Sequence, residues 1–153
     1  ALMKRRSPKR QATIDARPAI ATISDSREPV RPHDENLREF VRRLPCVVCM
    51  APTLRGDPCH WRTVARHGDW LEVDGVAVGN IFPGCRLHHA EQHQVGIRSW
   101  SARHGLDLGP ISTAVGRAYL GGWSAEGLAA AVLTARCYTR VDLSLRLDGG
   151  LPF

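Results

Sequence analysis

One segment, GCRLHHAEQHQVG at positions 84–96, concentrates side chains that commonly bind metal ions: Cys85, His88, His89 and His93. Imidazole is polar and needs a hydrogen-bond partner when it is buried, so a packed core gains little from such a cluster. His89 and His93 are four residues apart and share one face of a helix, which is a recurrent way to hold a metal ion. The segment therefore predicts metal binding, at one site or at two.

A pair of cysteines earlier in the chain has the same spacing as Cys85 and His88. Two residues separate Cys46 from Cys49, and two separate Cys85 from His88. Three thiolates and an imidazole suit tetrahedral Zn²⁺, and four protein ligands leave no open coordination position. We therefore predict a structural zinc site formed by these four residues. The alternative is that the three cysteines are small core residues.

The charge of the chain is concentrated at its N-terminal end. The 153 residues carry a formal net charge of +6, and residues 1–32 contain eight basic and three acidic side chains. This segment is rich in Arg, Pro and Ser and lacks periodic hydrophobicity, which predicts a flexible basic arm. The arm either aids solubility or holds nucleic-acid phosphates. The residues predicted to contact DNA there are Lys4, Arg5 and Arg6.

Membrane insertion and secretion are not expected from the composition. The sequence contains no run of about 18 apolar residues, the length that a membrane-spanning helix needs. No apolar stretch follows the basic N-terminus, so a secretory signal is not predicted either. We expect a cytoplasmic protein, and in that reducing compartment clustered cysteines favour metal ligation over disulfides.

For the rest of the chain, residues 33–153, the length and the pattern of apolar residues predict one domain of mixed helices and strands. Apolar residues recur with helical spacing in five segments: 36–44, 86–94, 97–104, 110–120 and 124–138. Strand patterns occupy 59–64, the stretch WLEVDGVAVGN interrupted at Asp74–Gly75, and the C-terminal segment from 141. Pro45 and Gly105 end two of the helices, and Ser124 is a good N-cap for the last one.

Three short stretches together resemble the HNH (ββα-metal) endonuclease family. They are DPCH at 57–60, GNIFPGC at 79–85 and RLHHAEQH at 86–93. In that family a histidine ends a strand, an asparagine follows in the far loop of the hairpin, and one or two histidines come from the next helix. The histidine-rich stretch is similar to the phage subgroup that includes the recombination-enhancement (Ref-like) nucleases. The resemblance covers about residues 38–105.

The resemblance implies an α+β fold with a small zinc-stabilised ββα-metal core, flanking helices and a C-terminal helical extension over 106–153. It implies metal-dependent hydrolysis of DNA phosphodiester bonds, with His60 as the general base. Asn80 would fix the loop and orient His60 through a backbone carbonyl. His89 and His93 would bind the catalytic ion, which is Mg²⁺, Mn²⁺, Ni²⁺ or Zn²⁺. The implied partners are DNA and a recombinase or another phage protein.

One position departs from the family pattern. The residue before the predicted base is often an aspartate or histidine that binds the metal, and here it is Cys59. A thiolate is a poor ligand for Mg²⁺. Either Cys59 binds a softer catalytic ion, or it only packs and Asp57 reaches the ion. Cys59 could also compete for the structural zinc.

The neighbouring residues support weaker predictions. Arg62, Arg66 and Arg86 flank the predicted site and could hold phosphates, although Arg62 and Arg66 could equally lie on a solvated strand face. Gln92 is expected to face solvent. The alternative function is a zinc-stabilised nucleic-acid-binding module without catalysis, which would have no need of His60, Asn80 or His93.

Overall fold

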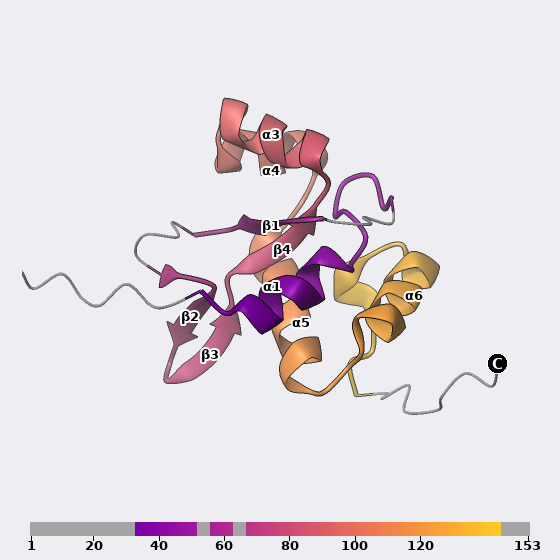
Figure 1. Ribbon diagram of the computed structural model, residues 1–153. Coiled ribbons are helices and arrows are strands. Elements are labelled where there is room, and N and C mark those ends of the chain that lie inside the picture. The colour runs from indigo at the N-terminus through magenta and orange to yellow at the C-terminus, as the bar shows by residue number, and fades with distance from the viewer. Residues whose placement is uncertain (1–32, 52–55, 63–66, 145–153) are drawn as a thin grey trace, which may run out of the picture.

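The computed structural model describes residues 33–51, 56–62 and 67–144 (Figure 1). The helices are α1 (Glu35–Arg42), α3 (Arg86–Val95), α4 (Ile97–His104), α5 (Leu108–Leu120), α6 (Ala125–Ala135) and the 3-10 helix η2 (Tyr138–Arg140). The strands are β1 (Asp57–His60), β2 (Trp70–Val73), β3 (Val76–Gly79) and β4 (Ile81–Gly84). The predicted α+β class is confirmed. The predicted arm with Lys4, Arg5 and Arg6, together with Arg66 and the chain after residue 144, lies outside the described residues.

Two antiparallel strand pairs bring distant parts of the sequence together. β1 pairs with β4, so that Asp57 lies opposite Gly84 and His60 lies opposite Ile81. The hairpin β2–β3 is inserted between them and extends away from the first pair (Figure 1). Its turn is Asp74–Gly75, and both residues have positive φ, as a two-residue I′ turn requires. The interruption predicted at this dipeptide is confirmed.

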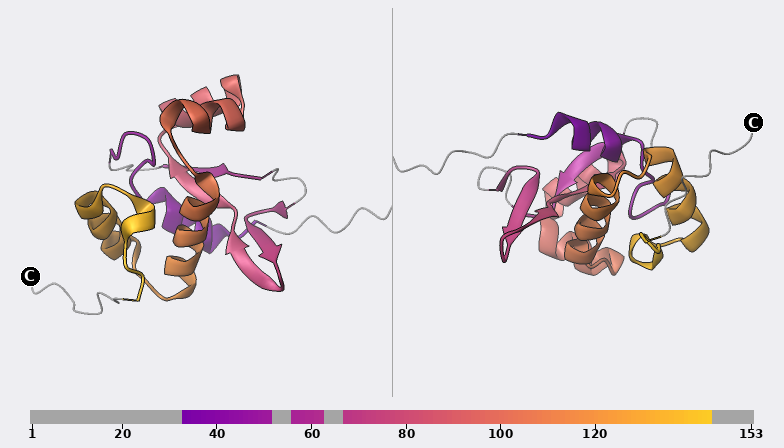
Figure 2. Two further views of the ribbon diagram at one scale, coloured as in Figure 1. Left: turned by 180° about the vertical axis from the view of Figure 1, so that it is seen from behind. Right: turned by 90° about the horizontal axis from the view of Figure 1, so that it is seen from below.

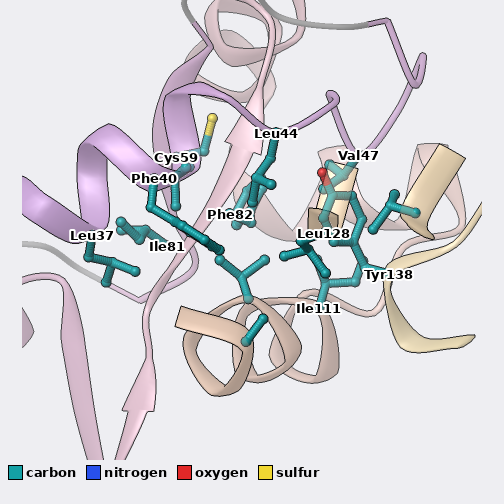
Figure 3. Packing of buried hydrophobic residues seen from close by; sticks show 14 of the residues in the cluster. Leu37, Phe40, Leu44, Val47, Cys59, Ile81, Phe82, Ile111, Leu128 and Tyr138 are labelled. Carbon is teal, nitrogen blue, oxygen red and sulfur yellow. The ribbon is translucent and has the colours of Figure 1, made fainter. Parts of the chain in front are cut away.

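The apolar residues of α1 explain where the core forms. Leu37, Phe40 and Val41 lie on one helical face and are buried, and every residue of β4 is buried as well. α1 and α5 pack on opposite sides of β4 (Figure 2). Figure 3 shows side chains from α1, β4, α5 and α6 gathered in this core. Each fully buried aliphatic or aromatic side chain contributes about 1.5–3 kcal/mol to folding.

Two glycines set the distance between α5 and the hairpin. A Cβ atom added at Gly79 would lie 2.5 Å from the backbone oxygen of Ser112, and one at Gly116 would lie 2.8 Å from the backbone nitrogen of Gly79. Only glycine permits this approach of backbone to backbone. The contact fixes the end of β3, and therefore the position of Asn80, which follows directly.

The helices at the end of the chain follow the predicted caps. Ser124 accepts a hydrogen bond from the Gly127 N–H at 3.0 Å and begins α6, as predicted. Gly105 ends α4 in the left-handed conformation. No helix among the described residues has both the length and the apolar character needed to cross a bilayer.

Candidate functional site

The four residues of the predicted zinc site come together. The potential ligand atoms of Cys46, Cys49, Cys85 and His88 all lie within 4.8 Å of one another. His88 Nδ1 is 3.5 Å from Cys46 Sγ and 3.1 Å from Cys85 Sγ. Tetrahedral zinc with ordinary bond lengths places a sulfur and a nitrogen ligand about 3.6 Å apart. The cluster therefore has the donor set and spacing to hold a metal ion such as Zn²⁺.

Two elements far apart in the sequence supply this cluster. Cys46 and Cys49 lie in a tight turn after α1, which is closed by a 2.9 Å hydrogen bond from the Met50 N–H to the Cys46 oxygen. Cys85 is the N-cap residue of α3, and His88 lies in its first turn. The Val47 N–H donates to the Pro83 oxygen at 3.1 Å, which joins the turn to β4.

A second pair of histidine nitrogens converges on the same helix. Nε2 of His89 and Nε2 of His93 are 2.9 Å apart, and Asp57 Oδ2 lies 3.1 Å from the other nitrogen of His89. Two imidazoles bound to one ion at ordinary bond lengths have their nitrogens about 2.9–3.4 Å apart. A carboxylate behind the ring fixes the tautomer of a metal-binding histidine. The pair could therefore hold an ion and leave coordination positions open.

Cys59 lies in the core (Figure 3). Its side chain is fully buried, and its Sγ donates to the backbone oxygen of Asp57 at 3.4 Å. Burial raises the pKa of the Cys59 thiol far above its usual range, which keeps it protonated. Within the described parts of the chain, no group of three or more potential ligands includes Cys59. Cys59 therefore packs in the core, whereas Asp57 contacts His89 Nδ1, on the opposite side of the ring from the Nε2 pair.

His60 ends β1 and bonds to a carboxylate that sequence reasoning did not identify. Its Nε2 lies 2.9 Å from Asp69 Oδ1, and its side chain is 20% exposed. Burial lowers the pKa of His60 and outweighs the opposing hydrogen bond to Asp69. The imidazole is therefore neutral at pH 7 and retains one nitrogen lone pair that can accept a proton.

Asn80 is fully buried and holds the chain that follows His60. Its side-chain oxygen accepts from the Arg62 N–H at 2.8 Å, and its side-chain nitrogen donates to the oxygens of Arg62 and Gly68 at 3.2 and 2.8 Å. The predicted role in fixing the loop matches these bonds. The predicted way of orienting His60 does not, because the imidazole Nε2 bonds to Asp69 and the Asn80 carbonyl accepts from the Trp61 N–H.

Gln92 corrects a further expectation. It is 7% exposed and does not face solvent. Its amide nitrogen donates to the backbone oxygen of His60 at 3.2 Å, because β1 covers this face of α3. Gln92 thus ties the histidine-bearing helix to the strand that ends in His60. A single sequence gives no signal for this contact, since the two residues are 32 positions apart.

The arginines predicted to hold phosphates have different environments. The guanidinium of Arg62 lies 4.7 Å from the centre of the Trp61 ring and stacks over it. Arg86 is 91% exposed, and its Nε is 3.9 Å from Asp57 Oδ2. Both lie beside residues of the candidate site.

No protein-family model, curated protein or solved structure matches this chain.

Proposed function

We propose that the chain is a metal-dependent endonuclease of the HNH (ββα-metal) type that hydrolyses phosphodiester bonds in DNA. One observation carries the proposal. The imidazole nitrogens of His89 and His93 converge to 2.9 Å on a helix whose Gln92 contacts the backbone of His60. An open histidine pair and a neutral imidazole thus lie on adjoining elements. The order β1, β4, α3 also supplies the strand, strand and helix that the resemblance calls for.

Each residue of the proposed site has a separate role in the reaction. A divalent ion bound by His89 and His93 would polarise the phosphate and offset negative charge on the leaving 3′ oxygen. His60 takes a proton from the attacking water, whose oxygen forms a bond to phosphorus as the bond to the 3′ oxygen breaks. Asn80 keeps the chain after His60 in place through its three side-chain hydrogen bonds.

The donor set of the open pair bears on which ion it takes. Imidazole nitrogen suits Ni²⁺ and Zn²⁺, whereas Mg²⁺ prefers oxygen ligands and retains several waters. Asp57 is engaged with His89 Nδ1, so the carboxylate supports the histidine pair. We therefore expect Ni²⁺ or Zn²⁺ to support activity better than Mg²⁺ does.

The four-ligand cluster has a separate role in this proposal. Its three cysteines and His88 would fill every position around a tetrahedral ion, which leaves none for phosphate or water. It would fix the turn after α1 against the start of α3. Because His89 follows His88 directly, a zinc ion in this cluster would also set the position of the open histidine pair.

Cleavage of supercoiled plasmid DNA by the zinc-loaded full chain tests the proposal. The variants are His60→Ala and His93→Ala, each assayed with added Mg²⁺, Mn²⁺, Ni²⁺ or Zn²⁺ and with none. Removal of a general base lowers a rate by roughly 10²–10⁴-fold. We expect a loss of that size in His60→Ala and a loss of metal-dependent cutting in His93→Ala, with DNA affinity nearly unchanged in both. His67→Ala is the matched control, because His67 belongs neither to the four-residue cluster nor to the His89–His93 pair.

The same experiment separates catalysis from binding alone. A zinc-stabilised nucleic-acid-binding module would bind the plasmid without cutting it under any ion, and all variants would behave alike. Equal loss of binding and cutting in His60→Ala would contradict the assignment of His60 as the base. Cutting that persists in His93→Ala with unchanged ion preference would contradict the open metal site.

A further inference from the structure

Asp69 is an ionisable residue that the proposed mechanism has not yet used. It precedes β2, and its side chain is fully buried. A buried carboxylate is costly unless it is paired and hydrogen-bonded. Here the first partners come from α1 and its N-cap residue, 31 and 35 positions away in the sequence. Oδ2 accepts from the Asp34 N–H at 2.7 Å and from Arg38 Nε at 2.8 Å, and Oδ1 lies 3.0 Å from a second Arg38 nitrogen.

These partners keep Asp69 ionised. Burial on its own raises the pKa of Asp69, but the hydrogen bonds from Arg38, His60 and the Asp34 N–H outweigh it and bring the pKa to about 2. A charged carboxylate can only accept hydrogen bonds. Since Oδ1 lies 2.9 Å from His60 Nε2, that nitrogen must carry the proton. The Nδ1 atom of the neutral ring then keeps the lone pair.

A metal ion is a competing explanation for this cluster. One potential ligand atom from each of His33, His60 and Asp69 lies within 4.8 Å of the others. The guanidinium of Arg38, however, already bonds to both carboxylate oxygens and also contacts His33 Nδ1. A cation placed there would lie against that positive charge. The arrangement instead matches an arginine–carboxylate–imidazole chain, in which each donor has an acceptor.

We propose that Asp69 is a positioning residue that holds the His60 ring in its Nε2–H tautomer, so that Nδ1 takes the proton from water. The inference rests on the proposed function. Arg38 contributes by holding the carboxylate through two bonds. Asn80 ties the two backbones together, because its N–H donates to the backbone oxygen of Asp69 at 2.9 Å and its own backbone oxygen accepts from the Trp61 N–H. The carboxylate also stabilises the imidazolium that forms when Nδ1 takes the proton.

The tautomer can be measured without any reaction. In the zinc-loaded full chain labelled with ¹⁵N-histidine, the side-chain NMR signals of His60 distinguish a protonated nitrogen from a bare one. We expect wild-type His60 to carry its proton on Nε2 at pH 7.5. The Asp69→Asn variant should lose this preference, because an amide can present either a donor or an acceptor to the ring. A wild-type ring protonated on Nδ1 would overturn the proposal, even if Asp69→Asn does not fold.

Plasmid cleavage then tests the catalytic consequence. We expect Asp69→Asn to lower the cleavage rate by roughly 10²–10⁴-fold, as loss of a correctly oriented base does, while DNA affinity changes little. Glu126→Gln removes the same charge at an exposed ion pair with Arg43 and serves as the control. A changed tautomer with an unchanged rate would overturn the catalytic role. If the wild type cuts no DNA, the proposed function fails, and the NMR result alone decides whether Asp69 positions the ring.

Discussion

His88 and His89 are neighbours in α3, yet they belong to two clusters of opposite kinds. His88 faces three cysteines from the turn after α1 and the start of α3. His89 faces one further histidine and a carboxylate from β1. A closed set of four soft ligands suits a structural ion, whereas an open pair leaves room for a substrate. Under the proposed function, one helical turn would serve stability through His88 and catalysis through His89.

The region around the closed cluster and the region around His60 also differ in what holds them in place. Around the closed cluster, the turn after α1 is held by short-range backbone hydrogen bonds, by the Val47 N–H bond to the Pro83 oxygen, by the Tyr138 hydroxyl bond to the Pro45 oxygen and by the buried side chain of Val47. Around His60, the side chains of Asn80 and Asp69 make long-range hydrogen bonds that need no metal. A bound ion would add four ligand bonds between α3 and the turn after α1, so we expect the first region to depend more on its ion, whereas the second depends on buried polar side chains.

The largest expected effect comes from breaking the closed cluster. Cys46→Ser removes one of four ligands and should release the zinc, with a loss of unfolding free energy of roughly 5 kcal/mol or more, since metal binding in such sites is part of folding. Thermal denaturation followed by circular dichroism, together with zinc content, measures both changes. The matched control is Cys137→Ser, because Cys137 lies outside the cluster and contacts Thr139.

That prediction separates the two regions only if zinc matters to the fold. An unchanged melting temperature in Cys46→Ser would show that the cluster does not stabilise the domain. A similar loss in Cys137→Ser would show that the effect is not specific to the ligands. In either case the contrast between a metal-dependent and a metal-independent region would fail.

Local patterns in the sequence were enough to predict much of the fold. The α1 apolar spacing, the Asp74–Gly75 turn and the Ser124 cap depend on residues within a few positions of one another, and the structure has all three. The grouping of the four closed-cluster residues was also predictable, because two knuckles of equal spacing indicate one shared ion.

The surroundings of His60 were not predictable in the same way. Asp69 bonds to Arg38, 31 residues away, and Gln92 bonds to the His60 backbone, 32 residues away. No periodicity links these positions, so only the packing of α1 and α3 against β1 brings them together. Cys59 shows the same limit, because its type suggested a ligand while its alternation within β1 directs it into the core.

The next effect in size concerns the open pair. Asp57→Asn removes the charge behind His89 and should weaken the binding of Ni²⁺ or Mn²⁺ at this pair by about 10–100-fold, as loss of such a supporting carboxylate does. Titration calorimetry on the zinc-loaded protein measures the affinity. Zinc content should remain unchanged, because Asp57 does not belong to the closed cluster.

A matched variant makes that result specific. Asp142→Asn removes an exposed carboxylate whose hydrogen bonds within the described residues go to Ser144, and it should leave the affinity for added ion unchanged. Equal weakening in both variants would indicate a general charge effect. Loss of zinc from Asp57→Asn would mean that the two clusters are not independent.

The smallest effect is the dependence of stability on pH through His60. Burial lowers the pKa of His60 below its ordinary value of 6.5, so the neutral ring is favoured in the folded state. Its contribution to stability is therefore fully present above about pH 6.5 and is lost as the pH falls through the lowered folded-state pKa.

Urea denaturation of wild type and His60→Asn between pH 5 and 8 isolates this contribution, because zinc ligation is common to both proteins. We expect the wild type to lose stability relative to the variant as the pH falls. A difference that does not change with pH, or one that grows on acidification, would mean that the His60 ring is not held neutral by its surroundings, and the contrast between the two regions would then rest on zinc alone.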